Sequence, residues 1–363
     1  MSIFKKIFQQ KNEPTNTYQE FWSWFIKNEQ VFFKSIKSEK NIDEDVFDKI
    51  SSKLKEIKDG FYFLVGMLDD NTVDFIFSAE GNPKNIAFVE ELVAVAPDIK
   101  GWKFTALKPA WDKDGWEVSM NGYKFGVENI SFYANDVPGY PDEIDIAVVH
   151  HDLTEENREM LKNGIYIFLD NYLGELPFLT MIDNISIVEK SEAQSDLIPI
   201  NKIRDYLIWR EKEFVEKYND VRHNTESDRY TAYEAAGETP LIAVMNTSLL
   251  QWDSKASHPW IVVVEIKFDG QDNSGLPDNK TYQLLDKLED EIASQLECAD
   301  GYLNVGRQTA NGVREIYYAC KDFRKPSKLL YEICKRYEDT YAMSYDIFKD
   351  KYWRTFERFT PPE

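Results

Sequence analysis

The chain has 363 residues, of which 43% are hydrophobic and 14% aromatic. A chain of this length and composition is expected to fold into about two domains and not to be disordered. Its 43 basic residues are outnumbered by 64 acidic residues, which leaves a net charge of −21. Nonspecific binding to nucleic acid or to an anionic membrane needs a basic face, so the charge argues against both kinds of partner.

The N-terminal stretch does not have the pattern of a targeting segment. Two lysines interrupt the apolar residues of Ile3–Phe8, whereas a signal peptide needs an unbroken apolar run and a small-residue cleavage site. We expect this stretch to pack on the domain or fray, not to anchor in a membrane, and no segment approaches the roughly 20 apolar residues of a membrane span. Cys298, Cys320 and Cys334 form no Cys-x-x-Cys motif. Such sparse cysteines indicate a reducing compartment, so we expect a cytoplasmic protein.

The first 198 residues combine helix and strand patterns. Thr17 and Glu20 have the spacing of a capping box, which predicts a helix N-cap at Thr17, and Asn82-Pro83 predicts the start of a later helix. Strand patterns occur at 61–68, 72–79, 102–107, 116–120, 123–127, 130–133, 144–149 and 181–188. These patterns predict an N-terminal α+β domain over residues 1–198 with a mostly antiparallel sheet.

A linker and a second domain follow. A helix pattern and a polar loop predict a linker over 199–227, and the weak periodicity of 222–238 places the domain boundary there. The C-terminal domain, 228–363, has strand patterns at 241–250, 260–268, 302–307, 313–320 and 341–348 and helix patterns at 284–296 and 326–337. The order β-β-α-β-β-α-β predicts a ferredoxin-like sandwich with one added strand. The predicted fold class is therefore α+β, with two α/β-sandwich domains and mostly antiparallel sheets.

No catalytic motif stands out. The chain lacks the phosphate-binding GxxxxGK[ST] pattern, the GxSxG nucleophile pattern and the HExxH metal pattern. Adjacent carboxylates are frequent, but in so acidic a chain they are expected mainly on solvated helix faces. His150 and His151 are neighbours at a strand end, where successive side chains point to opposite faces and cannot easily bind one metal ion. We therefore predict no catalytic residue, no metal site and no cofactor.

The most distinctive segment is the predicted hairpin around Asn311-Gly312, a pair typical of a type I′ turn. Arg307 and Arg314 flank this turn, and the alternation of a strand places Glu315 and Tyr317 on the face opposite to Arg314. The two arginines could bind a partner's anion or form a cross-strand ion pair with Glu315. The candidate binding residues are Arg307, Thr309, Arg314, Glu315, Tyr317, His258 and Trp260.

The hairpin and two segments before it resemble a bacterial family. The residues that carry the resemblance are Gly306-x-x-Thr309-x-x-Gly312-x-Arg314-Glu315-x-Tyr317-Tyr318, with Pro259-Trp260 and Leu288-Glu289-Asp290 before them. That family is domain of unknown function number six hundred and ninety-five, and the resemblance covers about residues 228–360. It implies a ferredoxin-like α+β domain, in places linked to proteins similar to the B-type regulator of ribonuclease E, a small acidic protein that binds a nuclease. The segment Val149–Thr154 is faintly similar to that regulator. The family implies no catalytic residues.

The leading functional hypothesis is a non-catalytic, acidic protein-binding module that regulates or neutralises a nuclease or another basic partner. Negative charge would steer association with a basic protein and could mimic a phosphate backbone. The sequence leaves the oligomeric state open.

Two other functions remain open. The first is a hydrolase with an active site between the domains, in which His150, His151 or His258 acts with a nearby carboxylate as acid or base. It requires these histidines to converge with carboxylates in one deep pocket. The second is a small-molecule sensor, which predicts an apolar pocket lined by the abundant Trp and Tyr side chains.

Overall fold

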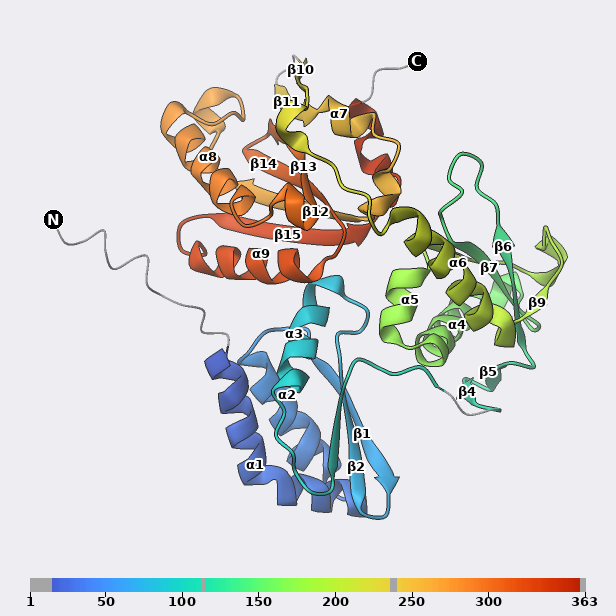
Figure 1. The fold of residues 1–363 in the computed structure, drawn as a ribbon. Coiled ribbons are helices and arrows are strands. Elements are labelled where there is room, and N and C mark those ends of the chain that lie inside the picture. Colours follow the sequence, from blue (N-terminus) through green and yellow to red (C-terminus); the bar gives the residue numbers. More distant parts are fainter. Residues whose placement is uncertain (1–14, 112–114, 236–239, 360–363) are drawn as a thin grey trace. The chain divides into compact units, whose positions relative to one another are not determined.

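The computed structural model describes residues 15–111, 115–235 and 240–359 (Figure 1). The chain divides into two compact units. Unit 1 comprises residues 1–112 and 170–178, and unit 2 comprises 113–169 and 179–363. The predicted domain bounds, 1–198, 199–227 and 228–363, divide the chain differently from these units. They remain a prediction. The Ile3–Phe8 stretch lies outside the described residues.

Unit 1 is a small sheet with helices packed on it. Its sheet has the order β1-β2-β3, with β1 antiparallel to β2 and β2 parallel to β3. The helix α3 connects the parallel pair, and its N-cap Asn82 accepts a hydrogen bond from the Lys84 amide, as predicted. The elements are α1 (Thr15–Ser38), α2 (Asp48–Lys55), β1 (Tyr62–Asp69), β2 (Thr72–Ser78), α3 (Pro83–Ala94) and β3 (Trp102–Ala106). The helix α1 begins at Thr15, so the predicted N-cap at Thr17 is wrong and this residue lies inside the helix.

A buried carboxylate attaches the distant segment 170–178 to unit 1. Glu175, the first residue of α5 (Glu175–Met181), is fully buried. Its carboxylate accepts hydrogen bonds from the Ser78 hydroxyl at 2.9 Å and from the amides of Ala79, Gly81 and Lys108 at 2.8, 3.0 and 3.1 Å. Four donors therefore compensate for the desolvation of this charge.

The first part of unit 2 contains a four-stranded sheet of order β8-β7-β6-β9 and a separate hairpin, β4-β5. The strand β7 (Asp145–His150) is almost wholly buried and pairs antiparallel with β6. The other elements are β4 (Glu117–Met120), β5 (Tyr123–Gly126), β6 (Ile130–Asn135), α4 (Arg158–Leu173), β8 (Asn184–Ile187), β9 (Ile198–Pro199) and α6 (Ile203–Tyr218). The last residues of α4, from Asp170 on, belong to unit 1.

The second part of unit 2 is built on a six-stranded sheet of order β10-β11-β13-β14-β12-β15, all antiparallel. The four strands β12, β13, β14 and β15 with α8 and α9 have the order and connections of a ferredoxin-like sandwich. The strands β10 and β11 extend this core at one edge. The elements are β10 (Tyr230–Ala235), β11 (Leu241–Asn246), α7 (Thr247–Leu250), β12 (Trp260–Lys267), α8 (Asn279–Ala293), β13 (Tyr302–Ala310), β14 (Val313–Cys320), α9 (Arg324–Arg336) and β15 (Ala342–Lys349).

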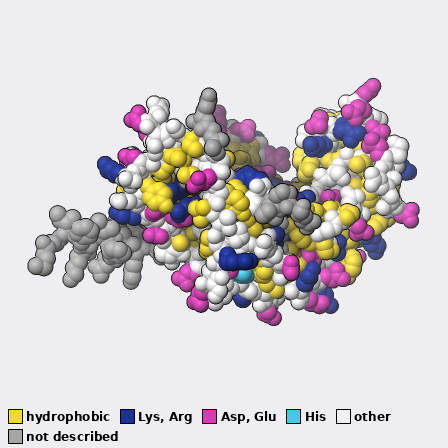
Figure 2. All heavy atoms as spheres, turned by 90° about the horizontal axis from the view of Figure 1, so that it is seen from above, with side chains coloured by type: hydrophobic (Ala, Val, Ile, Leu, Met, Phe, Trp, Pro, Cys, Tyr) yellow, Lys and Arg dark blue, Asp and Glu magenta, His cyan; other side chains and the backbone are white. Residues whose placement is uncertain are grey.

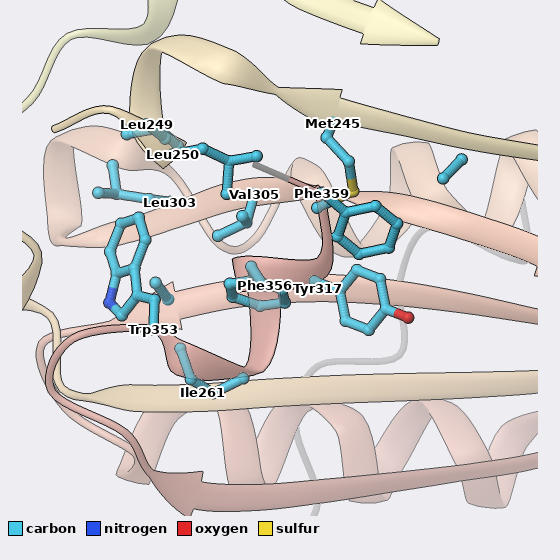
Figure 3. Close-up of a cluster of buried hydrophobic side chains, with 12 residues drawn as sticks. Met245, Leu249, Leu250, Ile261, Leu303, Val305, Tyr317, Trp353, Phe356 and Phe359 are labelled. Atoms are coloured by element: carbon cyan, nitrogen blue, oxygen red, sulfur yellow. The ribbon is translucent and has the colours of Figure 1, made fainter. Parts of the chain in front are cut away.

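The two faces of this sheet are covered differently. The helices α8 and α9 pack on the face that bears Arg314 and Tyr318, here called the helix-covered face. On the opposite face, the C-terminal 3₁₀ helix η9 (Arg354–Phe359) and α7 enclose a second hydrophobic cluster. Figure 3 shows Trp353, Phe356 and Phe359 packed against sheet residues of this cluster. The cover formed by η9 and α7 spans only part of this face. Residues nearer the β13–β14 turn are partly or fully exposed.

The predicted α+β class with mostly antiparallel sheets is confirmed. The sequence predicts one added strand, but the structure has two, because β10 lies in the polar stretch that follows α6 and is mostly exposed. Among the described residues, no helix combines the length and the apolar character needed to cross a bilayer.

Candidate functional site

The β13–β14 hairpin has the predicted turn. Asn311 and Gly312 both have positive φ, at 53° and 72°, as a type I′ turn requires. The strands then alternate their side chains between the two faces of the sheet. Arg307, Thr309 and Arg314 lie on the helix-covered face.

The arginines of the hairpin hold α8 against the sheet. Arg314 is only 1% exposed, and its guanidinium lies 2.9 Å from the Asp286 carboxylate and donates to the Thr309 hydroxyl at 3.2 Å. Arg307 donates to Glu289 at 2.7 Å. These ion pairs are with α8, so the sequence-based alternative of a cross-strand pair with Glu315 is wrong. The two arginines are already occupied by acidic partners within the domain.

Glu315 and Tyr317 lie together on the opposite face. The Glu315 carboxylate accepts hydrogen bonds from the Tyr317 hydroxyl at 2.9 Å and from the Gln308 amide at 2.8 Å. The Tyr317 ring belongs to the hydrophobic cluster, and its hydroxyl points out of that cluster (Figure 3). Burial and the nearby Glu315 raise the pKa of Tyr317 well above its usual value, which keeps the hydroxyl protonated as a donor.

A second glutamate stands directly opposite Glu315. In the β12–β14 register, Glu265 is the partner of Glu315, and it accepts a hydrogen bond from the Ser344 hydroxyl at 3.2 Å. The exposed Asp346 follows on β15, opposite Val263. Among the described residues, no lysine or arginine forms an ion pair with Glu265 or Glu315; the Arg358 guanidinium donates to the Tyr317 hydroxyl at 3.0 Å, not to either carboxylate. We call these two glutamates the acidic pair.

The acidic pair is an unfavourable arrangement by itself. Side chains directly opposite on antiparallel strands have Cβ atoms about 4.5–5.5 Å apart, and like charges there destabilise the sheet. Two unit charges at 4 Å repel by about 1 kcal/mol even in water. In the view of Figure 2, acidic and basic side chains are interspersed. What distinguishes the acidic pair from other acidic side chains on the surface is therefore the direct pairing of two like charges, not a broad patch of negative charge.

His258 and Trp260 lie away from the acidic pair. Trp260 pairs with Cys320 at the end of β12 that is remote from the β13–β14 turn, and its ring packs edge-on against Phe323. His258 is 1% exposed, and its Nδ1 is 2.8 Å from the Ser257 hydroxyl. Burial, with the nearby positive charges of Lys321 and Arg222, lowers the pKa of His258 to about 3. The seven candidate residues therefore do not form one site.

The histidines proposed for hydrolysis also lack carboxylate partners. The buried His150 hydrogen-bonds through Nε2 to the Lys124 carbonyl and accepts at Nδ1 from the Asp152 amide, both backbone groups. His151 is exposed. Neither the His150 nor the His258 hydrogen bonds include a carboxylate. The described residues hold no group of three or more His, Cys, Asp and Glu placed to bind a metal ion.

Two further features lie at positions that no local sequence pattern indicates, although the sensor alternative predicts an apolar pocket lined by Trp and Tyr side chains. The His223 Nε2 lies 2.9 Å from the Asp228 carboxylate, which also accepts from the buried Asn246 amide at 2.7 Å. A cavity of about 290 Å³ lies beside Tyr302 and Tyr318. The adjacent tyrosines of β14 were a visible signal, but nothing local showed which of them would border a cavity.

Comparison with known proteins gives one match. No curated protein and no solved structure matches the chain. The matching segment begins within β10 and ends one residue after η9, so it holds the six-stranded sheet and both of its covers. Residues 231–360 match the model of a family described as Family of unknown function (DUF695).

Proposed function

We propose that this protein is a non-catalytic protein-binding module that takes a basic segment of a partner against the acidic pair. The observation that carries the proposal is the direct cross-strand pairing of Glu265 with Glu315, neither of which forms an ion pair with a lysine or arginine of the described residues. A lysine or arginine of a partner placed between the two carboxylates would replace their repulsion by attraction.

The surroundings suit a protein segment. The acidic pair lies on the part of the sheet that η9 leaves open, and the neighbouring Ser344 and Asp346 are exposed. The hydrogen bonds from Gln308 and Tyr317 hold the Glu315 carboxylate in place. Arginine suits such a site because its planar guanidinium can bond more than one carboxylate oxygen at once.

The net charge of −21 adds long-range attraction for a basic partner. Basic segments are typical of proteins that contact phosphate backbones. We therefore propose a nuclease or another nucleic-acid enzyme as the partner class, with this protein regulating or neutralising it. We also propose a cytoplasmic location, which is supported by three cysteines that form no disulfide.

The test uses a library of short arginine- and lysine-containing peptides, titrated calorimetrically against the whole protein at low salt. The double variant Glu265→Gln/Glu315→Gln removes the acidic pair without changing side-chain shape. The matched control is Glu332→Gln/Glu338→Gln, two exposed acids in and just after α9 that give the same change in net charge.

We expect the best peptide to bind at least tenfold more weakly to the acidic-pair variant and with nearly unchanged affinity to the control. We also expect added salt to weaken binding to the unmodified protein. Equal losses in the two double variants, or no peptide that distinguishes the unmodified protein from the acidic-pair variant, would overturn the proposal.

A further inference from the structure

The helix-covered face of the six-stranded sheet leaves its two outer strands, β10 and β11, open. The helices α8 and α9 lie side by side, and the Tyr337 hydroxyl at the end of α9 donates to the Glu291 carboxylate of α8 at 2.9 Å. On its other flank, α8 is held to β13 by the bond from Arg307 to Glu289. The strands β11 and β10 come next in the sheet order, and most of their side chains on this face are exposed or half-buried.

The open part of this face is mainly apolar. In the β10–β11 register, Ala232 pairs with Val244, and Glu234 pairs with Ile242. Ala232 is exposed, Val244 is half-buried and Ile242 is 37% exposed. Tyr230, at the start of β10, is 52% exposed. We call Tyr230, Ala232, Ile242 and Val244 the open strip.

The opposite face of the same strands shows the effect of a cover. There, Ala243 and Met245 of β11 are fully buried in the cluster that η9 and α7 enclose. Their neighbours Ile242 and Val244 point to the helix-covered face and stay accessible. Apolar side chains that remain exposed together are typical of an interaction surface.

The open strip has the dimensions of one α-helix. Neighbouring strands lie about 4.8 Å apart, so two strands occupy about 10 Å of the sheet, whereas packed helices have axes about 8–10 Å apart. The six residues of β10 extend over about 20 Å, which is the length of about 13 residues of helix. One further helix beside α8 would therefore complete the layer over this face.

The unpaired charged groups at the border of the open strip are acidic. Glu234 projects from β10 on the same face as the strip. Glu297 follows the end of α8 and borders the same cavity as Tyr230 and Ala293. Both glutamates are exposed, and neither forms an ion pair with a lysine or arginine of the described residues.

The basic groups near the open strip already have acidic partners. Arg307 donates to Glu289 at 2.7 Å. Lys325 lies over the Tyr302 ring, beyond the Tyr230 end of the strip, and donates to Asp300 at 3.0 Å. A helix that covers the strip is therefore complementary to it when its own flanks carry lysine or arginine.

We infer that the open strip binds an amphipathic α-helix of a partner protein, with apolar side chains on one side and lysines or arginines on its flanks. This helix would lie beside α8, bury Ile242 and Val244, and place cations near Glu234 at one edge and Glu297 at the other. Recognition of an amphipathic helix by an apolar surface is a recurring mode of protein binding. The strip and the acidic pair lie on opposite faces of the sheet, so this inference does not rest on the proposed function.

The experiment measures the fluorescence anisotropy of three labelled peptides of about 13 residues, the helix length that fits the strip, titrated with the whole protein. The first peptide carries leucines on one helical face and lysines on its flanks. The second has the same composition with leucine and lysine alternating, as suits a strand. The third has the order of the first, with glutamate in place of lysine.

We expect the helical basic peptide to bind at least tenfold more tightly than either of the others and to gain helical circular dichroism on binding. Tighter binding of the alternating peptide would indicate strand addition at the free edge of β10 and would overturn the inference. Equal binding of the glutamate peptide would overturn it as well.

Variants of the apolar residues locate the binding. Ile242→Arg places a cation in the middle of the open strip and should weaken binding of the helical basic peptide at least tenfold. The matched control is Ile208→Arg on α6, at an apolar position that is 64% exposed and lies outside the strip. Equal binding by these two variants would overturn the inference.

Variants of the acidic residues test the charge complementarity. Glu234→Gln/Glu297→Gln should weaken the helical basic peptide about three- to tenfold, and added salt should reduce this difference. The control Glu332→Gln/Glu338→Gln makes the same change in net charge and should bind normally. Equal losses in the two double variants would show that net charge alone attracts the peptide and would overturn the inference.

A second strip variant separates lost binding from misfolding. Ala232→Arg changes an exposed residue of β10, so it should keep the thermal midpoint of the unmodified protein and still weaken the helical basic peptide at least fivefold. Normal binding by this variant at an unchanged midpoint would overturn the inference.

The acidic-pair variant keeps this inference distinct from the proposed function. Glu265→Gln/Glu315→Gln should bind the helical basic peptide normally, and Ile242→Arg should still bind the best peptide of the acidic pair. Loss of the helical basic peptide in Glu265→Gln/Glu315→Gln would assign its binding to the acidic pair and would overturn the inference.

Discussion

Glu265 and Glu315 carry the proposed function because a strand register brings them together. Fifty positions apart in the sequence, they become cross-strand neighbours when β12 pairs with β14. Each retains hydrogen-bond donors, Ser344 for Glu265 and Gln308 with Tyr317 for Glu315, so both stay oriented while they repel. A cation from a partner would relieve that repulsion. The same two residues therefore lower the stability of the free protein and favour the binding of a basic partner.

Replacing Glu265 with glutamine should therefore stabilise the protein. The change keeps an acceptor for Ser344 and removes one of two like charges, which is worth about 0.2–1 kcal/mol in the free energy of unfolding. Urea unfolding at low salt measures the gain, and the gain should shrink as salt screens the repulsion. Glu332→Gln is the control for loss of a negative charge elsewhere. A destabilised Glu265→Gln variant would contradict the repulsion argument.

The buried His258 predicts a dependence of stability on pH. Its pKa of about 3 in the folded protein lies below the usual value of 6.5, so between these values only the unfolded chain binds the proton. This contribution to stability is present above pH 6.5 and is lost as the pH falls towards 3. The free energy of unfolding should fall by about 1.4 kcal/mol per pH unit from this group within the window.

The comparison variant is His258→Asn, whose amide can still meet the Ser257 hydroxyl. Denaturant unfolding at pH 7, 6 and 5 should show a shallower loss of stability in this variant than in the unmodified protein. His151→Asn, at an exposed position, controls for removal of an imidazole. Parallel pH curves for the His258→Asn variant and the unmodified protein would exclude His258 as the titrating group.

At the scale of elements, the helix start at Glu175 determines how a distant segment joins unit 1. The carboxylate satisfies three backbone amides and the Ser78 hydroxyl near the end of β2. Because these amides come from loops, no ladder of a sheet could satisfy them. One side chain thus fixes both a turn and the position of α5.

Glu175→Gln should destabilise unit 1 by about 2–4 kcal/mol, because an amide group would face backbone donors in a site closed to water. Thermal or urea unfolding measures the loss, and the exposed Glu20→Gln on α1 should change stability by less than about 0.5 kcal/mol. Hydrogen exchange of the Ala79 and Gly81 amides should accelerate in the Glu175→Gln variant. Unchanged exchange would contradict the anchoring role.

Element recognition from sequence followed the strength of local signals. The β13–β14 hairpin was predictable because Asn311-Gly312 accepts two positive φ angles and alternating side chains flank it. The strand β10 was missed because five of its six residues are exposed, so no apolar alternation marks it. The strand β10 forms through its backbone hydrogen bonds with β11, and the spacing of apolar residues along the chain does not reveal such a pairing.

At the scale of the whole molecule, the net charge of −21 should oppose compaction at low ionic strength. Screening by salt reduces this self-repulsion more than it weakens buried ion pairs such as Lys351–Asp183. We therefore expect the thermal midpoint to rise by a few degrees between about 0.01 M and about 0.3 M sodium chloride. Choline chloride at equal ionic strength should act similarly, and a falling midpoint would contradict the prediction.

The acidic excess, the α+β class and the ferredoxin-like order of the C-terminal domain were determined by the sequence alone. Turn chemistry, period-2 alternation and helical spacing act between residues close in the chain, so they can be recognised without a structure. Among the candidate site residues, this reasoning correctly placed Arg314 and Glu315 on different faces of one strand.

The contacts that each of those residues makes depend on the folded structure. Arg314 binds Asp286 of α8, and Glu315 faces Glu265. Strand register and helix packing are settled by burial summed over many remote residues, and a shift of one position would reverse the face of every side chain. The chemistry of the site therefore depends on contacts that no local pattern in the sequence records.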